Sequence, residues 1–144
     1  MNALLQRVTE ASVVVDTTRI AAIGPGLLVF VGVFPDDTPS IAEKLADRTL
    51  DLRIFADELK PMNRSVVDVG GEVLVVSQFT LAADTRKGRR PGFSSAAPPD
   101  IARAFYEVFV ERIRQRLGRV ATGSFGADMK VALVNDGPVT FLLD

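Results

Sequence analysis

The chain has 144 residues, with 17 Lys and Arg against 18 Asp and Glu, and it contains no His, Cys or Trp. This length fits a single domain spanning residues 1–144, and a hydrophobic fraction of 47% supplies enough apolar surface for a packed core. Without His and Cys, the sequence excludes Ser-His-Asp and Cys-His catalysis, thiol redox chemistry, disulfides and tetrahedral zinc sites.

The first third of the chain predicts three strands. Residues 4–15 are rich in β-forming side chains, and residues 19–23 form a shorter segment of the same kind. A Gly-Pro-Gly turn at 24–26 leads into residues 27–33, which are almost wholly apolar. We therefore expect the third strand to be buried on both faces.

No membrane or export segment is visible in the sequence. The longest uncharged stretch, residues 20–35, contains the Gly-Pro-Gly turn and is too short to span a bilayer. The N-terminus lacks a basic start followed by a long apolar core. We expect a cytoplasmic protein without a membrane partner.

The middle of the chain predicts a helix and a hairpin. The helix ends near residue 51 and starts either with a Ser40/Glu43 capping box or at Thr38 with Pro39 as first helical residue. Its expected buried face includes Ile41, Leu45 and Leu52. A short strand follows at residues 53–55, and Gly70-Gly71 predicts a hairpin between strands at 66–69 and 72–78.

The last third predicts a long loop, a second helix and the final strands. Residues 82–99 form the loop, and Asp100 caps a helix at 101–117. The helix buries Ile101, Phe105, Val108 and Ile113, and strands follow at 120–122, 129–135 and 140–143. The whole pattern indicates an α+β fold, a curled, mainly antiparallel sheet or barrel-like subunit with two main helices packed outside.

Three segments could carry function, and each also has a purely structural interpretation. Residues 77–81, Ser-Gln-Phe-Thr-Leu, follow an apolar strand and could line a pocket. Alternatively, they form a strand edge that satisfies its own hydrogen bonds. Residues 135–140, Asn-Asp-Gly-Pro-Val-Thr, have the composition of a turn between two strands. Within them, the Gly-Pro bond is of the type for which a cis peptide costs little, about 0.5–1 kcal/mol.

The third segment is a basic cluster in the long loop. Residues 84–99 hold Arg86, Lys87, Arg89 and Arg90 against a single acidic residue, Asp84. Such a cluster could bind phosphates or could be a solvated loop. Phe93 is the only aromatic residue near it in the sequence. The cluster therefore lacks the pattern of stacking aromatic side chains found in proteins that bind single-stranded nucleic acid.

Taken together, these segments resemble one known family. Leu4-Leu5-Gln6-Arg7-Val8 near the start, residues 77–81 and residues 135–140 occur in the order and spacing of the D-aminoacyl-tRNA deacylases, also called D-Tyr-tRNA deacylases. Met62-Asn63 and Ala127-Asp128-Met129 extend the resemblance over essentially the whole chain. Each motif alone is weak, but the set at this length is specific.

The resemblance implies an activity and a set of site residues. The family hydrolyses the ester of a D-amino acid, or of mischarged glycine, on the terminal adenosine of tRNA, and it works as a homodimer without metal, cofactor or protein nucleophile. Ser77, Gln78, Phe79 and Thr80 would form the pocket, and Gly137-Pro138 would be a cis pair inserted into the partner's pocket to reject L-amino acids. We also expect substrate contacts from Arg7, Asn135, Thr140, Phe125 and Met129, and contacts to the tRNA backbone from Arg86, Lys87, Arg89 and Arg90.

The composition is compatible with this chemistry, and two other functions stay open. An enzyme without His or Cys can use the 2′-hydroxyl of the terminal ribose to activate water, while backbone amides near Phe79 and Thr80 bind the oxyanion. Alternatively, the chain is a catalytically silent nucleic-acid-binding dimer on the same fold. A third possibility is an esterase with Thr80 as nucleophile.

Overall fold

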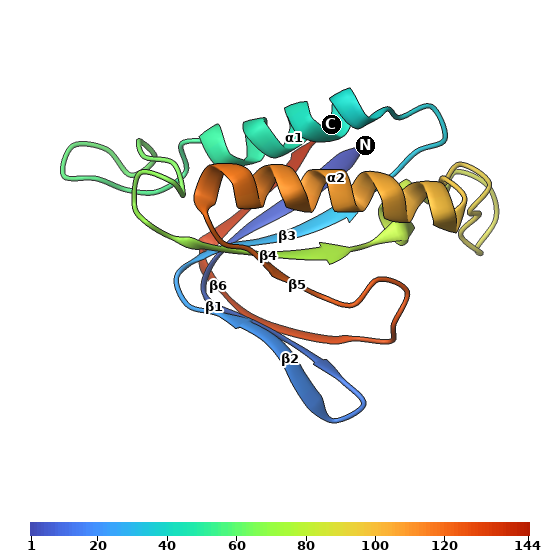
Figure 1. The fold of residues 1–144 in the computed structure, drawn as a ribbon, viewed down its shortest axis with the longest axis horizontal. Coiled ribbons are helices and arrows are strands. Elements are labelled where there is room, and N and C mark those ends of the chain that lie inside the picture. The colour runs from blue at the N-terminus through green and yellow to red at the C-terminus, as the bar shows by residue number, and fades with distance from the viewer.

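In the computed structural model, which describes residues 1–144, a mixed sheet curls beneath two helices (Figure 1). Its strands are β1 (Asn2–Val15), β2 (Thr18–Ile23), β3 (Gly26–Gly32), β4 (Glu72–Ser77), β5 (Ala121–Thr122) and β6 (Lys130–Leu143). The helices are α1 (Pro39–Asp51) and α2 (Pro99–Leu117), and a short 3₁₀ helix, η1 (Phe79–Ala82), follows β4. The predicted α+β class, with a curled sheet and two helices outside it, is confirmed.

β1 organises the sheet. It pairs antiparallel with β3 along its first half, with β2 along its second half and with β6 on its other edge. β4 instead runs parallel to both β3 and β5, so the connections on either side of β4 must cross over, and each carries a helix. β2 approaches β4 and β5, which nearly closes the sheet into a barrel.

The sheet separates two hydrophobic cores. Leu27, Val29 and Val31 of β3 belong to the larger core beneath the helices. Leu28 belongs to the smaller core inside the curl, together with Val8 of β1 and residues of β4. The prediction that β3 is buried on both faces is therefore confirmed.

The predicted hairpin around Gly70-Gly71 is wrong. Residues 66–70 form turns, and β4 pairs with β3 rather than with a strand at 66–69. Gly71 and Gly26 instead lie where neighbouring atoms come close: a Cβ at Gly71 would lie 2.9 Å from Val66 Cγ2, and one at Gly26 only 1.8 Å from the Glu72 carbonyl oxygen. The predicted strand at 53–55 is also wrong, since Phe55 makes only an isolated bridge with Arg64.

Both helices exist near the predicted positions, but their buried faces differ in part from the prediction. Of the two predicted starts of α1, the one capped by Thr38 with Pro39 as first helical residue is confirmed, whereas α2 starts at Pro99 without a capping side chain, so Asp100 is not its cap. Ile41 and Ile101 remain 40% and 37% exposed, and Phe105 and Val108 are only partly buried. Leu45 and Ile113 are buried as predicted, and the rest of each buried stripe consists of residues that the prediction did not include, among them Ala42, Ala46 and Leu50 in α1, and Ala102, Tyr106 and Phe109 in α2.

Charged side chains join the two helices on their outer side. Arg112 Nε lies 2.8 Å from Asp47 Oδ1, and Arg116 contacts both Asp47 and Asp51. The hydrogen bonds from Arg112 and Arg116 hold the pKa of the Asp47 carboxyl below its usual value despite partial desolvation. These contacts fix α2 against α1. Neither helix is long and apolar enough to cross a membrane.

Candidate active site

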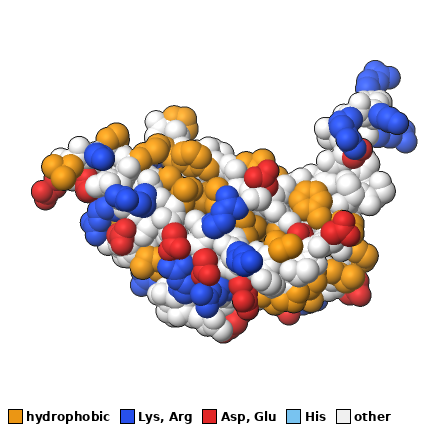
Figure 2. Space-filling view, turned by 90° about the horizontal axis from the view of Figure 1, so that it is seen from above, with side chains coloured by type: hydrophobic (Ala, Val, Ile, Leu, Met, Phe, Trp, Pro, Cys, Tyr) orange, Lys and Arg blue, Asp and Glu red, His pale blue; other side chains and the backbone are white.

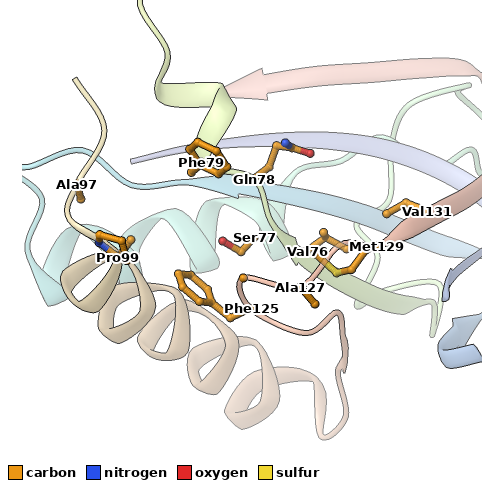
Figure 3. Close-up of a pocket in the computed structure, with 12 residues that line it drawn as sticks. Val76, Ser77, Gln78, Phe79, Ala97, Pro99, Phe125, Ala127, Met129 and Val131 are labelled. Carbon is orange, nitrogen blue, oxygen red and sulfur yellow. The ribbon is translucent and has the colours of Figure 1, made fainter. Parts of the chain in front are cut away.

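A cavity of about 420 Å³ opens where β4 ends. Ser77, Gln78 and Phe79 line it from the end of β4 and the start of η1, and Phe125 and Met129 line it from the segment before β6. In Figure 3, Phe79 and Phe125 lie on opposite sides of Ser77. Five of the predicted site residues thus meet in one pocket, although they are far apart in the sequence.

The sheet positions the first of these residues. Ser77 pairs with Val31 of β3, and the Gln78 amide donates to the Val31 carbonyl at 2.8 Å, so the ladder continues to the rim of the pocket. The chain then turns into η1, whose first amides have no partner within the helix. Gln78 Nε2 donates to Thr80 Oγ1, but Thr80 itself does not line the cavity.

The pocket contains no ionisable side chain. Of its twelve lining residues eight are hydrophobic, and the polar ones are Ser77, Gln78 and backbone groups. A pocket of this kind can position a ligand and donate hydrogen bonds, but its own side chains offer no general base.

Several lining residues carried no signal in the sequence. Ala97, Pro99 and Ala102 come from the long loop and the start of α2, and Gly126 comes from the turn before β6. They are small residues whose role is to leave space, and a missing side chain leaves no chemical pattern to detect. Val76 and Val131, which also line the pocket, look like ordinary strand residues.

Residues 135–140 do not form the predicted turn between two strands. β6 is one strand whose two halves both pair with β1 in the same direction. Gln6 pairs with Thr140 while Val8 pairs with Asn135, so residues 136–139 bulge out opposite Arg7. We call residues 136–139 the β6 bulge. Its Gly137-Pro138 peptide bond is cis, and both residues are exposed.

Three predicted substrate-binding residues hold this bulge rather than line the pocket. Arg7, whose side chain is 15% exposed, donates from Nε to the Asp136 carbonyl at 2.9 Å and from Nη1 to the Ile54 carbonyl at 2.6 Å. Asn135 closes the bulge, since its Oδ1 accepts from the Val139 amide at 2.6 Å and its Nδ2 donates to Thr140 Oγ1 at 3.1 Å. Gly137 and Pro138 do not line the cavity of their own chain.

The long loop at residues 82–99, which we call the basic loop, projects from the body of the molecule beyond the start of α2 (Figure 1). Lys and Arg side chains lie at its tip (Figure 2). Arg86 forms an ion pair with Asp84 at 2.8 Å, and this contact, mainly through its hydrogen bonds, holds the pKa of the Asp84 carboxyl far below its usual range. Lys87, Arg89 and Arg90 are exposed and make no ion pair. The predicted cluster therefore presents three free cations, not four.

Comparisons with known proteins agree over the full chain. A family model described as D-Tyr-tRNA(Tyr) deacylase matches residues 4–144. The chain is 60% identical to the D-aminoacyl-tRNA deacylase of Syntrophotalea carbinolica, with 100% of this chain and 97% of that protein covered. It is 58% identical to the protein of the same name from Thermotoga petrophila, again covering 100% and 97%.

Two solved structures share the fold. One, titled c-Myc DNA Unwinding Element Binding Protein, has a TM-score of 0.94 and 43% identity, covering 100% of this chain and 98% of that chain. The other, titled as a probable eukaryotic D-amino acid tRNA deacylase, has a TM-score of 0.86 at 20% identity, covering 99% and 97%. At that identity the second likeness concerns the fold alone.

Proposed function

The chain belongs to the D-Tyr-tRNA(Tyr) deacylase family, and on this premise we propose that it hydrolyses the ester that joins a D-amino acid to the terminal adenosine of tRNA. The observation that carries the proposal is the pocket at the end of β4, which gathers Ser77, Gln78, Phe79, Phe125 and Met129 and offers hydrogen-bond donors without an ionisable group. The products are a free amino acid and tRNA, and the work takes place in the cytoplasm, where aminoacyl-tRNA is used.

The protein's part in the reaction is positioning and charge stabilisation. The terminal adenosine and the ester carbonyl occupy the pocket, and the Phe79 and Thr80 amides donate to the carbonyl oxygen as it becomes an oxyanion. Positioning contributes up to about 7–11 kcal/mol and one oxyanion donor about 2.7–4 kcal/mol. An aminoacyl ester is already activated, so these two effects suffice.

The ribose supplies what the pocket lacks. Its 2′-hydroxyl lies beside the ester and helps to activate the attacking water, which adds to the carbonyl carbon. The tetrahedral intermediate then collapses, and the ribose oxygen leaves with a proton. The absence of any ionisable side chain among the lining residues supports this role.

The β6 bulge rejects L-amino acids in the partner's pocket. Its exposed Gly137 and Pro138 project from the edge of the sheet, and the Arg7 and Asn135 hydrogen bonds brace it from behind. A rigid backbone wall on one side of the bound α-carbon would clash with an L side chain and meet only hydrogen in a D substrate. Glycine has hydrogen on both sides, so mischarged glycyl-tRNA is also cleaved.

This arrangement requires a homodimer, and the free edge of β6 provides a suitable surface. β6 pairs only with β1, so its other edge is unpaired. Val134, Phe141 and Leu142 on this strand are 49%, 37% and 55% exposed, so large apolar side chains lie uncovered along it. A second copy packed here would bury them and bring the bulge to the partner's pocket.

The basic loop holds the tRNA backbone without reading chirality. Changing both Arg89 and Arg90 to Ala is expected to raise KM and to reduce the slope of log KM against log salt by about 1.4–1.8, because each phosphate contact contributes about 0.7–0.9. The ratio of D to L rates should not change. Lys60→Ala, at an exposed site in a different loop, is the matched control; a salt slope unaffected by the double substitution would make the cluster a solvated loop.

A second function has one specific observation in its favour. The solved structure at 43% identity is titled as a DNA-binding protein, and the three free cations would suit such a partner. The chain would then be a catalytically silent nucleic-acid-binding dimer. Release of amino acid from charged tRNA separates the two functions, because a binder releases none.

The direct test is a time course with purified protein and three substrates. D-Tyr-tRNA and glycyl-tRNA should be deacylated at catalytic enzyme concentrations, and L-Tyr-tRNA should survive as long as it does without enzyme. If D-Tyr-tRNA is no shorter-lived with the protein than without it, the chain is not a deacylase and the binding function gains support.

A further inference from the structure

Two exposed aromatic rings meet at the rim of the pocket. Phe79 and Phe93 lie with their ring centroids 5.1 Å apart at an interplanar angle of 53°. They are 57% and 42% exposed, and neither belongs to a hydrophobic core or packs against one. The two residues lie in different segments of the sequence. Their pairing in the fold therefore left no aromatic pattern around the basic cluster from which it could have been predicted.

The loop that carries Phe93 is firmly held. Gly92, directly before it, exchanges two backbone hydrogen bonds with Asp84 at 2.8 and 2.9 Å. Two residues after it, Ser95 Oγ donates to the Ala82 carbonyl at 2.5 Å, and further along the chain the Ala97 amide donates to the Val33 carbonyl at 3.0 Å. The ring is therefore presented in a fixed place, and a ligand that stacks on it does not have to order the loop first.

Charge of the matching sign lies next to the ring. Arg90 is three residues before Phe93, a span of at most about 11 Å of chain, and Arg89 and Lys87 precede it without ion-pair partners. Proteins that bind single-stranded nucleic acid combine cations for the backbone with aromatic rings for the bases. Fixed exposed rings beside free cations form this combination.

We propose that the Phe79–Phe93 pair is a stacking platform for the unpaired nucleotide that precedes the terminal adenosine of the RNA, with Lys87, Arg89 and Arg90 on its phosphates. The inference rests on the proposed function, because the terminal adenosine would occupy the adjoining pocket, whose rim Phe79 forms. The strand then leaves the pocket over Phe93 toward the basic tip of the loop.

The test uses Phe93, because Phe79 belongs to the pocket. Phe93→Leu keeps an apolar side chain and removes the ring face. It is expected to raise KM for D-Tyr-tRNA on the order of tenfold, the usual effect of losing one base–aromatic contact, with kcat unchanged. Phe93→Trp should restore the wild-type KM. D-Tyr esterified to a single adenosine, which lacks the preceding nucleotide, should show equal KM with all three proteins.

An abasic substrate identifies the stacked base. A D-Tyr-tRNA without the base before the terminal adenosine should raise the wild-type KM as much as Phe93→Leu does, and combining both changes should add no further increase. An unchanged KM with Phe93→Leu, or an equal rise with the single-adenosine ester, overturns the platform.

Binding of a short single-stranded RNA with the tRNA 3′ sequence, followed by fluorescence anisotropy, separates this proposal from the proposed function. Weaker binding by Phe93→Leu and recovery with Phe93→Trp support the platform even if the protein hydrolyses nothing. Equal binding by all three proteins overturns the platform even if deacylation is fast.

Discussion

D-Tyr esterified to a 2′-deoxy terminal adenosine is expected to be hydrolysed roughly 10²–10⁴-fold more slowly than the ribose ester, the range that a general base contributes. The reason lies in the pocket, where none of the twelve lining residues has a side chain that can take a proton from water at neutral pH. Removing the 2′-hydroxyl therefore removes the group that we assign to this role, while the hydrogen bonds to the carbonyl remain.

Thr80→Ala should have a much smaller effect, less than about tenfold, because the proposed donor at this position is the backbone amide, and the loss of one neutral hydrogen bond costs about 1 kcal/mol. Thr80 Oγ1 accepts a hydrogen bond from Gln78 Nε2, a donor that cannot activate it as a nucleophile. Complete loss of activity with Thr80→Ala, together with a covalent acyl-enzyme and a normal rate for the deoxy ester, would establish the Thr80 esterase instead.

Two controls make the ribose experiment interpretable. Each rate is divided by the rate of hydrolysis of the same ester without enzyme, because the 2′-hydroxyl also affects the ester's intrinsic reactivity. Competition by the deoxy ester against D-Tyr-tRNA shows whether it still binds. A deoxy ester that binds and is cleaved at the ribose rate contradicts substrate-assisted catalysis.

The success of the sequence predictions depended on how local the signal was. β3 could be predicted because an unbroken apolar run between turns needs no knowledge of its neighbours. β4 was predicted as a strand, but its partner was wrong, because Gly70-Gly71 has the composition of a hairpin turn whether or not it makes one. The true partner, β3, is separated from β4 by the whole of α1, and pairing over such a distance leaves no local pattern.

The site shows the same limit. The polar residues 77–80 could be identified because hydroxyls and an amide at the end of an apolar strand are chemically distinctive. Ala97 and Ala102 could not, because they contribute only space. The interpretation of residues 135–140 as a turn failed because the same residue types also build a bulge, and only the pairing of both halves of β6 with β1 distinguishes the two.

Gly137→Ala is expected to reduce the ratio of D-Tyr-tRNA to L-Tyr-tRNA cleavage by at least about tenfold, equivalent to 1.4 kcal/mol. Gly137 has φ of +146°, and a Cβ there would lie 2.6 Å from Val139 Cγ2 and 2.9 Å from the Val139 amide nitrogen. Asn135 holds that same amide at 2.6 Å, so Val139 cannot move aside without breaking the contact that closes the bulge. The wall must shift, and either the D substrate is hindered or the L substrate is admitted.

Gly70→Ala is the matched control for this substitution. Gly70 also has a positive φ, +66°, but a Cβ there would meet nothing within 4 Å, and the residue lies in the turn before β4. It should cost stability through the backbone alone, seen as a lower melting temperature, and leave the D/L ratio intact. An unchanged D/L ratio in Gly137→Ala would remove the bulge from the account of specificity.

Mixing two defective subunits tests whether the bulge acts in its own pocket or in the partner's. Ala127→Trp fills the cavity of its own chain but keeps the bulge, whereas Gly137→Ala keeps the cavity and damages the bulge. In a mixed dimer, one of the two sites would combine an intact cavity with an intact bulge from the other subunit. Co-expression with two different tags should then restore selective D-Tyr-tRNA cleavage at about a quarter of the wild-type number of sites, as expected for random pairing. If each bulge served its own cavity, every site in the mixture would carry one defect, and selective cleavage would not return.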